Sequence, residues 1–187
     1  MAKRLSEALR RFSNSWVALT GLGLFLLFTA VVLPREAART ATYAGEAGTP
    51  DMSLWYSSHE LYEMAEAYGP EGRSLYVRSR LTFDVIWPLV YTFFLTTAIS
   101  CVYDRAVSAD SRWRLANLAP ILAAALDFLE NGSASLVMVR YPLRTPVVDT
   151  GAGLFTLLKW ICIAASFLFL IGGFAAYLRR RVMRTAE

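Results

Sequence analysis

Residues 115–139 read LANLAPILAAALDFLENGSASLVMV, an apolar run whose middle contains Asp127, Glu130 and Asn131. A run of this length can cross a membrane, because an α-helix needs about 20 mostly apolar residues to span the hydrocarbon core. Three further runs are comparable, namely Trp16–Leu33, Leu81–Val102 and Gly153–Leu178. Backbone groups in lipid must be hydrogen-bonded internally, and strand-like alternation is absent, so these runs predict helices. The expected fold class is an all-α membrane protein.

The composition favours a membrane protein over a soluble one. Hydrophobic residues make up 56% of the chain and charged residues only 18%, whereas soluble domains hold roughly 25% charged residues. We expect one domain, residues 1–187, with spans at about 14–34, 81–103, 114–139 and 152–178. Two of the three connections are short, which makes successive helices antiparallel neighbours. The prediction is a four-transmembrane-helix up-down bundle.

The long connection, residues 35–80, is predicted to lie outside the cell membrane. Its first part, 41–50, is expected to be a loop. Residues 57–60 then read SSHE, a capping box that starts a helix at about 58–68. One face of this helix is apolar, formed by Leu61, Met64, Ala65 and Tyr68. We therefore expect a short extracytoplasmic amphipathic helix that lies on the membrane surface.

The distribution of basic residues predicts the topology. Segments on the N-terminal side of the membrane hold 11 bases against four acids, whereas the opposite side holds seven arginines and eight acids. Because cytoplasmic loops carry the excess of lysine and arginine, both termini should be cytoplasmic. The apolar core of the first span is longer than the about 7–15 residues of a signal sequence, so it should stay as an anchor. The expected location is the cytoplasmic membrane of a prokaryote, with the lipid bilayer and a second copy of the chain as candidate partners. The net charge of +4 reflects this topology and does not indicate a nucleic-acid partner, since no basic stripe alternates with exposed aromatic residues.

Ionisable residues inside the spans are the strongest indication of a site. Asp84, Asp127, Glu130 and Lys159 lie in otherwise apolar segments. A charge near the bilayer centre costs at least roughly 2.5–3.5 kcal/mol by insertion scales, so such residues usually face a partner or a cavity. A rise of about 1.5 Å per residue places all four between the outer surface and the midplane, with Lys159 within reach of Glu130. The sequence predicts a shared polar site that opens, if at all, to the outside.

Three functions fit this set of residues. An intramembrane enzyme, or a binder of a lipid-like or isoprenoid-like molecule, would use Asp127 and Glu130 as acid and base and Lys159 as an electrostatic partner. A proton-linked carrier or transport component would use the same acids. A structural or accessory subunit would need them only as an ion pair that fixes helix packing, with Lys159 neutralising one of the two acids. Further candidate binding residues are Asp84, Tyr91, Asn131, Arg78 and Arg80, of which either arginine could pair with Asp84.

The chain shows no pattern for a metal or cofactor. His59 is its only histidine, and the two cysteines, Cys101 and Cys162, are isolated and form no CxxC pair. We expect neither a metal ion nor a cofactor.

The string LYEMAEAYGPEGR at 61–73, followed by Asp84, Pro88 and Tyr91 and by DFLEN at 127–131, resembles a family of small prokaryotic four-span membrane proteins that has no assigned activity. The resemblance covers most of the chain after the first span. It implies a fold and assigns no role to any residue.

Overall fold

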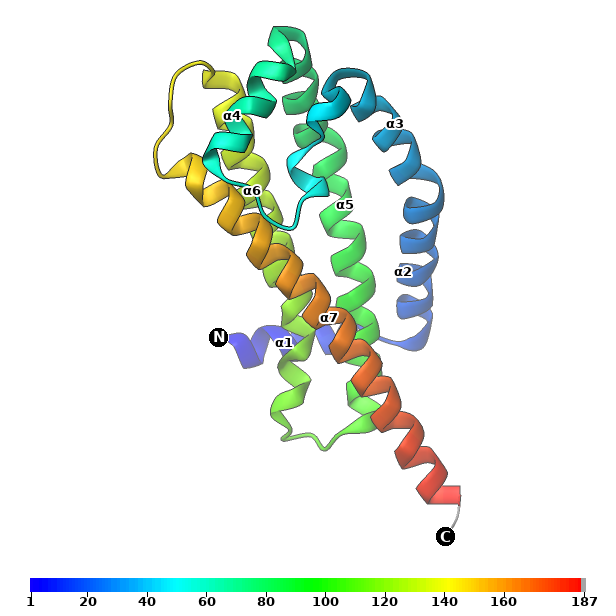
Figure 1. Cartoon of the computed structure of the whole chain (residues 1–187). Coiled ribbons are helices and arrows are strands. Elements are labelled where there is room, and N and C mark those ends of the chain that lie inside the picture. The colour runs from blue at the N-terminus through cyan, green and yellow to red at the C-terminus, as the bar shows by residue number, and fades with distance from the viewer. Residues whose placement is uncertain (186–187) are drawn as a thin grey trace. The chain divides into compact units, whose positions relative to one another are not determined.

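The computed structural model describes residues 1–185, and all elements of this part of the chain are helical (Figure 1). Four of its helices are long and apolar enough to cross a membrane, and their bounds are Ser15–Ala47, Gly69–Ala106, Arg112–Arg140 and Val148–Met183. The prediction of an all-α protein with four spans is confirmed.

The elements, in chain order, are α1 (Ala2–Phe12), α2 (Ser15–Leu27), the π-helix η1 (Phe28–Val32), α3 (Leu33–Ala44), the 3₁₀ turns η2 (Gly45–Ala47) and η3 (Pro50–Met52), α4 (Ser58–Ala67), α5 (Gly69–Ala106), the 3₁₀ helix η4 (Arg112–Leu118), α6 (Ala119–Arg140) and α7 (Val148–Thr185).

The connection between the first two spans contains more helix than expected at residues 41–44. The first span continues through η1 and α3 to Ala44, so residues 41–44 are helical and not part of a loop. Pro34 falls inside this continuous helix, where it has no N–H to donate to the preceding turn, and the π-helix η1 lies directly before it. Gly45 then ends the helix with a φ of +52°, a conformation that glycine adopts without strain. The second span extends from Gly69, so residues 69–80 are helical and continuous with it.

The described residues divide into two compact units. The first contains residues 1–26, 90–123 and 161–185, and the second contains residues 27–89 and 124–160. In the first unit α1, which the sequence did not predict, is fixed to η4. The Ser6 hydroxyl donates to the carbonyl of Arg114 at 3.1 Å, and the Asn117 amide donates to the carbonyl of Ser6 at 3.2 Å. An amphipathic N-terminal helix is thereby tied to the connection that precedes α6.

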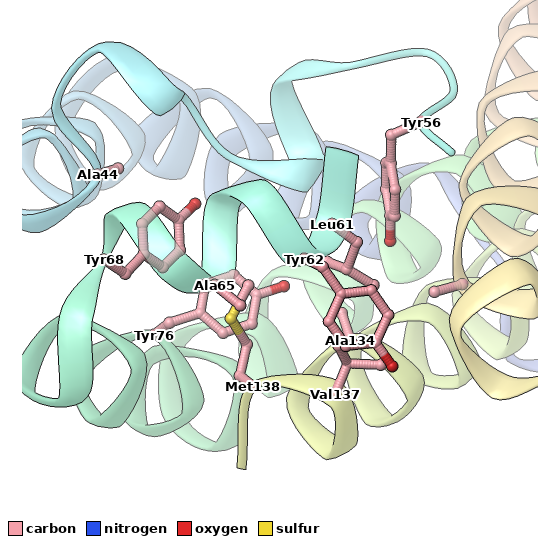
Figure 2. Packing of buried hydrophobic residues seen from close by; sticks show 11 residues of the cluster. Ala44, Tyr56, Leu61, Tyr62, Ala65, Tyr68, Tyr76, Ala134, Val137 and Met138 are labelled. Atoms are coloured by element: carbon pink, nitrogen blue, oxygen red, sulfur yellow. The ribbon is translucent and has the colours of Figure 1, made fainter. Parts of the chain in front are cut away.

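The second unit has its own apolar core, part of which comes from α4 (Figure 2). The capping box is confirmed, since the Ser57 hydroxyl accepts from the Glu60 N–H and the Ser57 N–H donates to the Glu60 carboxylate at 2.7 Å. These bonds from the Ser57 backbone and hydroxyl hold the pKa of Glu60 below its usual range. Leu61 and Ala65 are fully buried in a core with Tyr76 of α5 and Met138 of α6.

The expectation that the apolar face of α4 lies on the membrane surface is therefore wrong. This face is covered by protein, and α4 acts as a cap on the second unit. The physical reason is that a stripe of apolar residues on a helix is satisfied equally well by a protein core or by lipid.

A glycine on α7 allows this cap to close. A Cβ on Gly153 would overlap the backbone carbonyl oxygen of Tyr56, whereas a Cβ on Gly151 would meet only the Phe155 ring at 3.5 Å. We expect Gly153→Ala to lower the free energy of unfolding by about 1–3 kcal/mol, because the backbone of Tyr56 must shift. The control Gly151→Ala should be neutral or slightly stabilising. Thermal unfolding in detergent measures both variants, and equal melting temperatures would contradict the packing described.

Candidate functional site: a buried network of carboxylates and bases

Six ionisable side chains meet within the second unit. Arg80 and Asp84 lie one turn apart on α5, Asp127 and Glu130 lie on α6, Lys159 lies on α7, and Asp51 lies in η3. We call this set the polar network. Its five members on the spans are buried, whereas the side chain of Asp51 is 30% exposed. Asp51 is therefore the member that connects the network to the surface of the unit.

Each base of the network contacts more than one acid. The Arg80 Nη1 atom contacts the Asp51 carboxylate and lies 2.8 Å from the Asp84 Oδ2 atom. The Lys159 Nζ atom lies 2.5 Å from the Glu130 carboxylate, 3.4 Å from the Asp127 carboxylate and 3.7 Å from the Asp51 carboxylate. Lys159 thus contacts both acids on α6, although its single positive charge can neutralise only one of them. Asp51 bridges the two bases through its two carboxylate oxygens.

Asp51 is not among the residues predicted for the site. It lies in a segment without hydrophobic periodicity, and the path of such a segment does not follow from the sequence. A signal was nevertheless present. Asp51 is the only acid between residues 47 and 59, and its neighbours Met52, Leu54, Trp55 and Tyr56 are large and apolar. An isolated acid in an apolar stretch outside the spans is a candidate partner for an excess base inside them.

The network contains more acid than base. Among the described residues it has four carboxyl groups and two bases, so it carries a formal charge of −2 when every group is ionised. Burial raises the pKa of Asp51, but Arg80 and Lys159 outweigh this effect and hold that pKa below its usual range. Asp51 therefore keeps its negative charge at neutral pH, and the excess of acid falls on the carboxyl groups inside the spans.

Neutral polar groups surround the network. The Asn131 amide donates to the Asp127 carboxylate at 3.3 Å, while the Asn131 carbonyl oxygen and the Ser135 hydroxyl are buried without a hydrogen-bond partner among the described residues. Burial and the nearby Glu130 carboxylate raise the pKa of Tyr56, so this side chain stays a neutral hydroxyl beside the acids. The guanidinium of Arg80 also stacks on the Tyr76 ring, 4.4 Å from the ring centre. The neutral side chains of Tyr56 and Asn131 thus offer hydrogen-bonding groups beside the acids without adding charge.

The remaining predicted residues lie elsewhere. Arg78 is two residues from Arg80, which turns it away on the helix by about 200°, and it lines two cavities outside the network. Tyr91 is buried within the first unit. Of the five predicted binding residues, the structure brings Arg80, Asp84 and Asn131 together with the acids of α6. Within residues 1–185 no group of three or more histidine, cysteine, aspartate or glutamate side chains is arranged to hold a metal ion.

Comparison with protein-family models, with curated proteins and with solved structures gives no match for this chain. The resemblance to a family of four-span membrane proteins stays a prediction. The geometry of the network is therefore the basis for any functional proposal.

Removal of one base should be more damaging than removal of a matched ion pair. Lys159→Met leaves three carboxylates without their shared base and should cost about 3–5 kcal/mol of stability. The double variant Lys159→Met with Glu130→Gln restores the formal charge of −2 and should unfold at a higher temperature than Lys159→Met alone. Lys3→Met, which changes the only other lysine and lies at an exposed site, is the control and should match the wild type. A double variant no more stable than Lys159→Met would contradict the charge-balance argument.

Proposed function

We propose that this chain is a proton-responsive integral membrane protein whose polar network takes up protons from the outer side. The observation that supports this proposal best is the excess of two carboxyl groups over bases in a buried site. Several unbalanced negative charges are very costly in surroundings of low dielectric constant, and proton uptake removes that cost. A proton is also a ligand that requires no cavity.

The route for the proton in this proposal runs through Asp51. Its side chain is the partly exposed member of the network, and it contacts both buried bases. The excess of basic residues near the termini supports an orientation in which η3 faces the outside and both termini face the cytoplasm. In a prokaryotic cytoplasmic membrane the network would then respond to external pH.

Shared bases couple proton uptake to the position of the outer segment. Asp51 competes with Asp84 for Arg80, and it competes with Asp127 and Glu130 for Lys159. A proton on any of these three competitors removes a rival negative charge and strengthens the remaining pair with Asp51. Proton uptake inside the spans should therefore hold η3 more firmly. A change in protonation would thus change how tightly this segment is bound to the spans.

The same contacts give less support to an intramembrane enzyme that acts on a lipid-like or isoprenoid-like molecule. Asp127 and Glu130 would have to leave Lys159 to act as acid and base on a substrate. A purely structural role predicts instead that all four carboxyl groups stay ionised and paired. The protonation state of the network at neutral pH therefore separates the proton-responsive role from the structural one.

Infrared spectroscopy of purified protein in liposomes tests this proposal, because protonated carboxyl groups give a carbonyl band that shifts in heavy water. We expect the wild type to keep such a band at neutral pH, where exposed carboxyl groups with a pKa of about 4 are ionised. The band should weaken in Asp84→Asn and in Glu130→Gln. The control Glu63→Gln removes a carboxyl group whose side chain is 61% exposed, and it should leave the band unchanged.

Either of two infrared results would contradict the proposal. A wild-type spectrum without protonated carboxyl groups at neutral pH, or a band that survives unchanged in both Asp84→Asn and Glu130→Gln, would overturn the proposal and favour the structural role.

A further inference from the structure

A second feature of α5, independent of the polar network, is a cavity beside α6 near the outer end of both helices. It has a volume of about 520 Å³, within the range of small-molecule sites. Its basic lining comes from Arg73 and Arg78. Its remaining lining residues are polar or apolar and come from both helices and the turn after α6, namely Pro70, Ser74, Val77, Leu81, Thr82, Met138, Val139 and Tyr141.

The two arginines of this cavity lack acidic partners. Among the described residues, neither Arg73 nor Arg78 has a carboxylate within salt-bridge distance. Arg80, two residues further along α5, contacts two carboxylates. The cavity therefore holds two positive charges that have no carboxylate within salt-bridge distance, and an anion is the ligand of complementary charge.

Arg73 is also held in place. Its Nη1 atom donates to the carbonyl of Ala65 at 2.7 Å, and its guanidinium stacks on the Tyr141 ring, 4.7 Å from the ring centre. A guanidinium has five N–H donors, so one bond to a carbonyl leaves the others available. Planar guanidinium groups bind phosphate oxygens in pairs of parallel hydrogen bonds.

Part of the cavity wall is formed by apolar side chains that are exposed on the surface of the spans. Leu81 and Val139 line the cavity and are 69% and 67% exposed, which is expected of side chains that face lipid. A bound anion would thus have an apolar surface directly beside it. Arginine and tyrosine at the end of a span are also typical of the membrane interface, where lipid headgroups lie.

We infer that this cavity binds one anionic phospholipid, with its phosphate on Arg73 and Arg78 and the start of an acyl chain along Leu81 and Val139. The inference does not depend on the proton-responsive role. It assigns a function to Arg78, which the sequence singled out and the polar network does not use. The bound lipid would hold the outer ends of α5 and α6 together.

Native mass spectrometry of detergent-purified protein tests this inference, with phosphatidylglycerol as the anionic lipid and phosphatidylcholine as the neutral comparison. The wild type should retain one phosphatidylglycerol molecule in preference to phosphatidylcholine. Arg73→Gln with Arg78→Gln should weaken retention by about tenfold or more, as expected when charge-assisted hydrogen bonds are lost. Arg78→Gln alone should weaken it by about threefold to tenfold, and this variant breaks no side-chain hydrogen bond or ion pair among the described residues.

Two controls make the result decisive. Arg35→Gln removes an exposed arginine of α3 and should leave retention unchanged. Glycerol phosphate alone should compete weakly, because it lacks the acyl chain that the apolar wall binds. Equal retention of both lipids would overturn the inference. So would a loss in Arg35→Gln as large as that in Arg78→Gln, since either result would mean non-specific attraction to a basic surface.

Discussion

Charge balance in an apolar environment is the constraint on which the second unit of this protein depends. Lys159 and Arg80 sit in spans otherwise built from apolar residues, and an ionised base at such a depth requires acids close by. The acids come from α5, from α6 and from η3, and Asp51 bridges the two bases. One set of ion pairs therefore fixes helices distant in sequence and the segment outside the spans. Because that set holds more acid than base, we propose that it responds to protons as well as holding the unit together.

Packing near η3 also stabilises this set of ion pairs. Tyr68 donates to the carbonyl of Gly48 at 2.5 Å, just ahead of η3, and the core under α4 closes the space above α5 and α6 (Figure 2). Packing and this hydrogen bond therefore help the ion pairs to position the segment that carries Asp51. Two of the arginines of α5 differ in their surroundings: Arg80 belongs to the network, whereas Arg78 lines the cavity proposed for a lipid.

Several features of this site could be predicted from the sequence. Asp127, Glu130 and Lys159 could be brought together because helical periodicity and depth in the membrane follow from the chain alone. Asp51 could not, because the path of a non-periodic segment depends on tertiary packing. The apolar face of α4 was recognised, but the same stripe suits lipid or protein. Arg80 could also have been chosen over Arg78 as the partner of Asp84, because a spacing of four residues places two side chains on one face of a helix and a spacing of six does not.

Hydrogen exchange of residues 48–57, followed by mass spectrometry at neutral pH, tests the central role of Asp51 most directly. If Asp51 holds the outer segment through Arg80 and Lys159, Asp51→Asn should exchange faster than the wild type in this segment, because the bridge between the two bases is lost. Exchange in α1, which belongs to the first unit, should be unchanged. Glu46→Gln, which removes an exposed acid just ahead of the same segment, should behave like the wild type. Equal exchange in Asp51→Asn and the wild type would contradict this account of the network.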